Sequence, residues 1–403
     1  MAKILYVIHS GVTGGTFLTN KDLMKNVDGK YEVFLLTAEN DSLSLFNFSK
    51  GNLTLIKSYT RLNKWSAMNF HDSWLNYIYF DILTNLNIDL VHIRHLINHS
   101  FDLPEIAQKL GIPVVLSFHD FFFICPFYVL LDENKKFCNG VCNDNELNCY
   151  VPLKSLEDIN SKKFILEWRN NVLNLFKYIN CFITTSHVVK DIFLSIYPNM
   201  DEKNFYIIEH GRDFFNNQFF YEKPSLEKPI KILCPANHIN AMKGSEIIKS
   251  IKRYDVDSKL EFHFLGNCHD GIDEIGINHG TFERDDFFLR VKEIKPSFIG
   301  IFSIWPETFC HTLTEAWNCG IPVLGSNLGV IQDRILKEKG GWILNIDSPK
   351  CMYDKILEIA SNSDEYNTVL SNIKNIKFKS SKDMADDYLN IYNQLVHNHH
   401  HIK

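Results

Sequence analysis

Residues 303–329 read SIWPETFCHTLTEAWNCGIPVLGSNLG, and this order of residues is typical of a strand, a helix and a second strand in succession. A strand ends near Ser303, and the residues after it predict a helix with Thr308 as its N-cap. Gly320 and Pro322 end that helix and lead into the next buried strand. Strand–helix–strand units of this kind build parallel α/β sheets.

The same alternation fills the first half of the chain. Apolar strand-like runs are followed by segments of helical length, such as 98–110 and 156–178. Val, Ile and Leu on both faces of the strands predict a parallel sheet that helices cover on two sides. The predicted strands are 3–9, 31–37, 90–95, 113–118, 181–185 and 205–208.

The pattern starts again after residues 220–229, a polar stretch with two prolines that resembles a linker. The predicted strands there are 230–234, 260–265, 298–303 and 322–325. We therefore expect an α/β protein with two Rossmann-like doubly wound domains that face a cleft, residues 1–215 and 216–385. Residues 386–403 form a final helix and tail that either stay with the second domain or cross back to the first.

Composition narrows the class of protein. Lys and Arg number 42 and Asp and Glu 48, a formal charge of −6, which argues against nucleic acid as a partner. Apolar residues make up 45% and exclude disorder as the main state. No stretch reaches about 18 consecutive apolar residues, and the first residues lack a signal-peptide pattern. We therefore expect a cytoplasmic protein with mostly reduced thiols.

The predicted helix start carries a pattern suited to a diphosphate. Backbone amides at the start of a helix bind anions, and those here belong to Phe309, Cys310 and His311. If helical geometry held from Glu307 to Glu315, the two carboxylates would lie roughly 12 Å apart along the axis. That is about the length of a nucleoside diphosphate sugar. In the alternative interpretation, Glu307 only caps the helix and Glu315 is a solvated surface charge.

This stretch resembles the Glu-x7-Glu signature of retaining GT-B glycosyltransferases, in particular glycosyltransferase family 4, and the similarity extends over most of the chain. The resemblance implies that Glu307 contacts the hydroxyls of the donor sugar and that Glu315 contacts the ribose. It also implies a GT-B fold, with 1–215 on the acceptor side and 216–385 binding the nucleotide-sugar donor. No cofactor and no metal are expected.

Lys243 and Gly244 follow a predicted strand and match the Lys-Gly element of that family, whose cations bind the donor diphosphate. The arginine of the family falls on His238 or Asn237, so one cation is missing. Gly14 and Gly15 resemble the family's glycine loop near the donor, although a simple tight turn is the alternative.

His119 and Asp120 end another predicted strand, where α/β active sites form. The family has a histidine here near the donor sugar, so the resemblance makes His119 catalytic together with Lys243 and Glu307. Asp120 would orient the histidine or face the acceptor. A structural histidine is the alternative.

Two further features leave alternatives open. Four cysteines are close in sequence and could hold a structural zinc, stay as free thiols or form a disulfide: Cys125, Cys138, Cys142 and Cys149. The basic amphipathic segment 156–178 either packs in the ordinary way or makes a peripheral contact at the inner face of a membrane.

The resemblance implies a retaining, metal-independent hexosyltransferase. It would move a sugar from a nucleotide sugar to a glycan or lipid-linked glycan in surface polysaccharide synthesis. No residue stands out as a covalent nucleophile, so Lys243 and the helix amides would stabilise the leaving diphosphate. A sugar-nucleotide epimerase of the same fold and a catalytically idle sugar-binding subunit are the alternatives.

Overall fold

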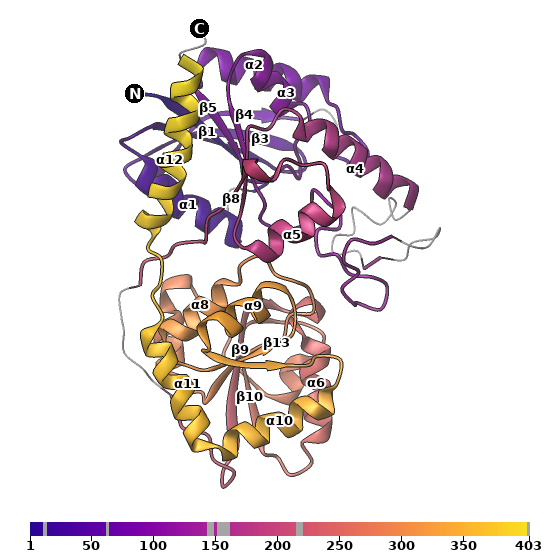
Figure 1. Cartoon of the computed structure of the whole chain (residues 1–403), viewed down its shortest axis with the longest axis vertical. Coiled ribbons are helices and arrows are strands. Elements are labelled where there is room, and N and C mark those ends of the chain that lie inside the picture. Colours follow the sequence, from indigo (N-terminus) through magenta and orange to yellow (C-terminus); the bar gives the residue numbers. More distant parts are fainter. Residues whose placement is uncertain (11–13, 62–63, 143–148, 151–161, 215–220, 401–403) are drawn as a thin grey trace. The chain divides into compact units, whose positions relative to one another are not determined.

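The computed structural model describes residues 1–10, 14–61, 64–142, 149–150, 162–214 and 221–400. The chain forms two compact units (Figure 1). Unit 1 comprises Met1–Asn134, Cys138–Asp213 and Lys379–Lys403, and unit 2 comprises Lys135–Phe137 and Phe214–Phe378. The chain thus returns to unit 1 at Lys379, so residues 379–385 belong to unit 1 and not to the second domain to which the sequence analysis assigned them.

Unit 1 is built on an eight-stranded sheet with the order β4-β3-β2-β1-β5-β6-β7-β8. The six strands predicted from the sequence are present and parallel. Strand bounds are β1 Lys3–Ile8, β2 Glu32–Ala38, β3 Ser42–Ser49, β4 Asn52–Thr60, β5 Leu90–Ile93, β6 Val114–Ser117, β7 Cys181–Thr184 and β8 Phe205–Ile207.

The expectation of an entirely parallel sheet is wrong at one edge, where β3 and β4 are antiparallel. A tight turn joins these two strands, and Lys50 and Gly51 both have positive φ in it, 51° and 81°. Two successive residues with positive φ give the turn whose twist suits an antiparallel hairpin. Glycine at the second position adopts a positive φ without a steric clash.

The helices of unit 1 are α1 Gly15–Val27, α2 Ser73–Asn85, α3 Leu103–Lys109, α4 Lys162–Phe176, α5 His187–Ile196, the 3₁₀ turn η2 Glu202–Asn204 and α12 Ser381–His400. The helix predicted over 98–110 begins only at Leu103. Asn98 has a φ of 66°, which a right-handed helix does not allow. Residues 156–161 of the predicted segment 156–178 lie outside the described part of the chain.

The last helix, α12, packs on unit 1 beside α1 (Figure 1). Its tyrosines meet buried polar groups of the sheet. The Tyr392 hydroxyl lies 2.6 Å from His92 Nδ1, and Arg94 donates to the Tyr388 hydroxyl at 3.0 Å. All four side chains are almost fully buried. Specific hydrogen bonds, in addition to apolar packing, therefore fix α12 on the sheet.

Unit 2 contains a six-stranded parallel sheet with the order β11-β10-β9-β12-β13-β14. Four of its strands were predicted; the short β11 and β14 were not. Strand bounds are β9 Ile230–Ile239, β10 Leu260–Cys268, β11 Ile277–Asn278, β12 Phe298–Ile301, β13 Val323–Ser326 and β14 Gly341–Leu344. The two Rossmann-like units confirm the predicted α/β class.

Helices cover this second sheet, and its apolar side chains form one continuous core with theirs. The helical elements are η3 Ala241–Lys243, α6 Ser245–Tyr254, η4 Ile272–Ile275, η5 Arg284–Asp286, α7 Phe287–Ile294, α8 His311–Asn318, α9 Gly329–Glu338, α10 Pro349–Ser361 and α11 Ser363–Asn375. Among the residues that the structure describes, no helix is both long enough and apolar enough to span a membrane.

The tyrosine contacts of α12 lead to a testable expectation. Tyr392→Phe removes the hydroxyl that lies 2.6 Å from His92 and leaves a fully buried imidazole nitrogen without this partner. The free energy of unfolding should fall by about 1–3 kcal/mol. Tyr77→Phe, at a side chain that is 71% exposed, should change it by less than about 0.5 kcal/mol. Thermal midpoints from circular dichroism compare the two variants, and equal midpoints would contradict a role for the buried hydroxyl.

Candidate functional site

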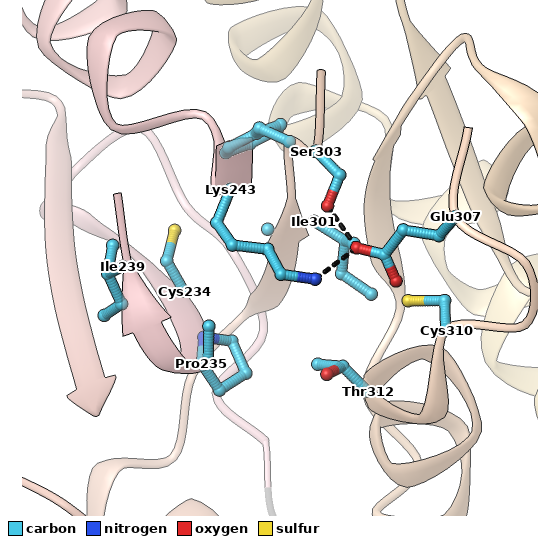
Figure 2. Close-up of a pocket in the computed structure, with 12 residues that line it drawn as sticks. Cys234, Pro235, Ile239, Lys243, Ile301, Ser303, Glu307, Cys310 and Thr312 are labelled. Atoms are coloured by element: carbon cyan, nitrogen blue, oxygen red, sulfur yellow. Dashed lines mark hydrogen bonds and ion pairs between the residues drawn. The ribbon is translucent and has the colours of Figure 1, made fainter. Parts of the chain in front are cut away.

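The predicted donor-binding residues of unit 2 follow two neighbouring strands. Lys243 lies in η3, just after β9, and Glu307 lies in the loop after β12. These strands pair in parallel, so their carboxyl ends share one edge of the sheet. Figure 2 shows the two side chains pointing toward one another at this edge. Residues 64 positions apart in sequence are thus brought into contact.

The turn that carries Lys243 is held rigidly. The Asn240 side chain caps η3 by accepting from the Lys243 amide at 3.3 Å. Gly244 follows with a φ of 84°, and a Cβ at this position would lie 2.2 Å from the Phe302 carbonyl oxygen. Only glycine permits this approach of the two backbones. Lys243 therefore lies in a 3₁₀ turn, directly before the glycine that precedes α6.

Lys243 and Glu307 form an ion pair. The Lys243 ammonium and the Ser303 hydroxyl both donate to Oε1 of Glu307 (Figure 2). Burial pushes the pKa of Glu307 upward, but the Lys243 charge and the hydrogen bonds from Lys243 and Ser303 outweigh it and lower the pKa. Burial likewise pushes the pKa of Lys243 downward, and Glu307 reverses this and raises it. Both groups are therefore ionised near neutral pH.

The ion pair borders a small cavity of about 20 Å³. A volume of this size has room for about one water molecule. A larger ligand at this edge must therefore displace or cover the pair. The other lining side chains include Cys234, Pro235, Ile239, Cys310 and Thr312 (Figure 2).

The prediction that Thr308 is an N-cap is wrong. Helix α8 begins at His311, and Cys310 occupies the N-cap position with a φ of 64°. Phe309 and Cys310 are buried, and Arg334 donates to their carbonyl oxygens at 2.9 and 3.1 Å. These contacts hold the loop in a non-helical form. Of the predicted anion-binding amides, only that of His311 is in the helix.

Glu307 and Glu315 are both buried, with 6% and 8% of each residue exposed. Only Glu315 lies in α8, so the axial separation of the two carboxylates that was calculated for one continuous helix does not apply. The alternative that Glu307 caps a helix and Glu315 is a solvated charge is wrong. A buried carboxylate needs hydrogen bonds or a cation, which Glu307 obtains from Ser303 and Lys243.

Seven predicted donor-binding residues do not line this cavity: Gly14, Gly15, His238, Thr308, Phe309, His311 and Glu315. His238 is exposed at the end of β9, and its Nδ1 lies 3.0 Å from Nε2 of His269. Gly14, with a φ of 107°, precedes α1 in unit 1, and Gly15 is the first residue of that helix. The structure thus groups Lys243, Glu307 and Cys310, and sequence reasoning missed the supporting side chains Ser303, Asn240 and Arg334. No sequence motif marked those three.

His119 and Asp120 follow β6 in unit 1. The His119 ring stacks on His210 at a centroid distance of 5.4 Å, and burial, with the nearby Arg94 charge, holds the pKa of His119 well below its ordinary value. It is therefore a neutral imidazole. Asp120 instead borders a second cavity, where it pairs with His95, a residue that the sequence analysis did not select.

The four clustered cysteines, all in the described part of the chain, form no disulfide, and Cys125 is buried. Burial, followed by the nearby Cys138, raises the pKa of Cys149 to about 12. Within the described ranges, no three His, Cys, Asp or Glu side chains form a group that could hold a metal ion, and this includes these cysteines.

Comparisons with known proteins identify the fold. No family model and no curated protein matches the sequence. Among solved structures, HepE of Anabaena in complex with UDP has a TM-score of 0.64 at 13% identity and covers 97% of this chain and 100% of its own. Sucrose-phosphate synthase of Thermosynechococcus elongatus has a TM-score of 0.68 at 13% identity, covering 98% and 99%.

The lipopolysaccharide outer core galactosyltransferase WaaB has a TM-score of 0.59 at 12% identity and covers 97% of this chain and 99% of its own. All three structures are glycosyltransferases of the GT-B fold. The chain therefore has the GT-B fold, as the sequence predicts.

The ion pair predicts unequal effects of removing its two members. In Lys243→Met the buried Glu307, whose side chain is 8% exposed, loses its cation, whereas in Glu307→Gln the Lys243 side chain, 35% exposed, can still be hydrated. Lys243→Met should therefore lower the free energy of unfolding by about 2–4 kcal/mol and Glu307→Gln by less. The surface pair Lys355–Glu358 provides matched controls, because Lys355→Met and Glu358→Gln should each cost less than about 1 kcal/mol.

The pH dependence follows from the shifts in pKa. The pKa of Glu307 is lowered from 4.5, so its stabilisation is present above that pH and is lost as the pH falls below it. The pKa of Lys243 is raised from 10.5, so its stabilisation is complete below that pH and is lost as the pH rises through the raised value. The difference in stability between the wild-type protein and Lys243→Met, measured by urea unfolding, should be largest near neutral pH, where both groups of the pair are ionised, and should close in acid. A difference that stays the same as the pH falls through the lowered pKa of Glu307 would contradict the pairing.

Proposed function

We propose that the protein is a retaining glycosyltransferase of the family 4 type. It transfers a hexose from a nucleotide sugar to a glycan or a lipid-linked glycan in surface polysaccharide synthesis. The observation that carries this proposal is the ionised Lys243–Glu307 pair at the carboxyl edge of a GT-B sheet. The names of similar structures support a nucleotide-sugar donor, since HepE was solved with UDP and with UDP-glucose.

The pair supplies one group for each half of the donor. The Lys243 ammonium leaves Glu307 and donates to the diphosphate instead, since phosphate oxygens also accept charge-assisted hydrogen bonds. Glu307 is then free to accept from hydroxyls of the donor sugar, while Ser303 still orients its carboxylate. The positive end of α8 begins at His311, and Thr312 borders the same cavity. The dipole of α8 adds to the attraction for the diphosphate.

The chemical step then depends on electrostatics. As the bond between the sugar and the diphosphate breaks, negative charge grows on the leaving phosphate, and Lys243 lies where it can stabilise that charge. The acceptor oxygen bonds the anomeric carbon on the face from which the diphosphate leaves, and a donor phosphate oxygen takes the hydroxyl proton, so the anomeric configuration is kept. Glu315 binds the ribose in this scheme, and no cofactor takes part.

This function is tested by transfer assays with a panel of UDP-, ADP- and GDP-sugars. Purified protein should release the nucleoside diphosphate only when an acceptor glycan is present. Lys243→Ala and Glu307→Ala should each lower that rate by roughly 10²–10³-fold, because each removes a group that acts on developing charge or on the sugar. The measurement is release of the nucleoside diphosphate, together with the product formed.

Lys355→Ala and Glu358→Ala are matched controls, because they break an exposed pair of unit 2 and should leave the rate unchanged. Conversion of the nucleotide sugar to its epimer without acceptor would indicate the epimerase instead. Full activity of Lys243→Ala or Glu307→Ala in folded protein would refute the assigned roles.

A further inference from the structure

Unit 1 contains a cavity that is much larger than the one beside the Lys243–Glu307 pair. Its volume is about 680 Å³, within the roughly 300–1,000 Å³ typical of small-molecule sites. It lies at the carboxyl ends of β1, β2, β5 and β6, which are neighbours in the sheet. Most of the residues that line it have polar side chains, and those used below are His9, Glu39, Asp41, Lys64, Trp65, His95, Asp120 and Tyr128.

Asp120 is held in this cavity as an oriented carboxylate. His95 is buried and its Nδ1 accepts from the Ile97 amide at 3.0 Å, so its proton is on Nε2, which donates to Asp120 at 2.9 Å. The Phe122 amide donates to the other carboxylate oxygen at 2.9 Å. Burial pushes the pKa of Asp120 upward, but His95 and the Phe122 amide outweigh it and lower the pKa. The carboxylate is thus ionised and remains 19% exposed.

The neighbours of Asp120 add no positive charge. Burial, followed by the nearby His95, lowers the pKa of His9 to about 3, so His9 is neutral at physiological pH. Burial, followed by the charge of Asp120, raises the pKa of Tyr128, so its hydroxyl stays protonated. The charged groups that line the cavity are therefore the carboxylates of Glu39, Asp41 and Asp120 and a single ammonium, that of Lys64.

Trp65 gives the cavity an anchored aromatic side chain. Its indole N–H donates to the His99 carbonyl at 3.1 Å, and its backbone amide donates to the Asn40 carbonyl at 3.2 Å. The ring position is therefore fixed at both ends of the residue. An anchored aromatic ring provides apolar contact area for a ligand, while carboxylates, amides and a hydroxyl provide hydrogen bonds. A sugar needs both kinds of contact.

We infer that this cavity binds the acceptor through a carbohydrate terminus that carries no negative charge, either a neutral sugar or an amino sugar. Asp120 accepts from its hydroxyl or ammonium groups, Tyr128 donates to it, and Trp65 contacts its ring. A phosphate or a carboxylate on that sugar would meet three carboxylates with one opposing ammonium, which rejects it by like-charge repulsion. This inference rests on the proposed function, because it specifies the acceptor of the same reaction.

Saturation-transfer NMR with the full chain tests the inference. Two matched series serve as probes: glucose, glucosamine, glucose 6-phosphate and glucuronate, and the corresponding galactose compounds. At least one neutral or amino sugar should bind, and the anionic members of its series should bind at least tenfold weaker. Trp65→Ala and Asp120→Asn should each weaken that binding at least tenfold, with folding checked by circular dichroism.

The charge argument has its own variants. The double substitution Glu39→Gln with Asp41→Asn should bring the anionic sugars to within about threefold of the neutral ones, since it removes two of the repelling charges. Glu202→Gln is the matched control, because Glu202 is an exposed carboxylate of unit 1 that does not line the cavity. Glu202→Gln should not change the binding of either sugar series.

UDP, ADP and GDP titrated into the same samples separate the two ideas. If a nucleoside diphosphate binds but no sugar does, or if the anionic sugars bind as well as the neutral ones, the inference is wrong and the proposed function stands. An unchanged preference in the double variant likewise overturns it. If no nucleoside diphosphate binds, the proposed function fails, while the sugar series still reports the charge preference of the cavity.

Discussion

The ion pair between Lys243 and Glu307 is the interaction on which the site of unit 2 depends. A buried carboxylate is stable only with a cation or good hydrogen bonds, and Glu307 has both. The pair fixes η3, which follows β9, against the loop that follows β12. It also means that two groups suited to a charged, hydroxyl-rich ligand neutralise each other in its absence. The ligand must supply equivalent partners for both.

The two units place different chemistry at equivalent positions. Each has a cavity at the carboxyl edge of its sheet, as doubly wound folds do. In unit 2 a cation and an anion share a volume of about 20 Å³. In unit 1 three carboxylates and one ammonium line a volume of about 680 Å³. Under the proposed function, charge alone would sort the two substrates, since a diphosphate would meet a cation in unit 2 and an excess of carboxylates in unit 1.

Much of this arrangement could be predicted from the sequence. The apolar runs predicted ten of the strands, because a strand buried on both faces is apolar throughout. The motifs around Lys243 and Glu307 predicted two residues that do meet. The hairpin of β3 and β4 was missed, since β3 is only partly buried and β4 is mostly exposed, so neither strand is a continuous apolar run.

Other features depend on contacts that no local pattern reveals. Thr308 has the residue type of an N-cap, yet α8 begins only at His311. Arg334 in α9 donates to the carbonyl oxygens of Phe309 and Cys310 and holds these residues outside the helix. The pairing of His95 with Asp120 joins the ends of β5 and β6. Such contacts arise from tertiary packing between residues far apart in sequence, and they override local preference.

Isothermal titration of UDP, ADP and GDP decides whether Lys243 exchanges Glu307 for a diphosphate. With the nucleotide that binds the wild-type protein best, Lys243→Met should bind at least about tenfold weaker, because a charge-assisted hydrogen bond is lost. Glu307→Gln should bind as tightly as the wild-type protein or more tightly. A nucleoside diphosphate lacks the hexose that Glu307 would hold, and in this variant Lys243 does not have to leave a charged partner to bind the diphosphate. Equal affinity of Lys243→Met and the wild-type protein, or equal weakening in both variants, would contradict the exchange.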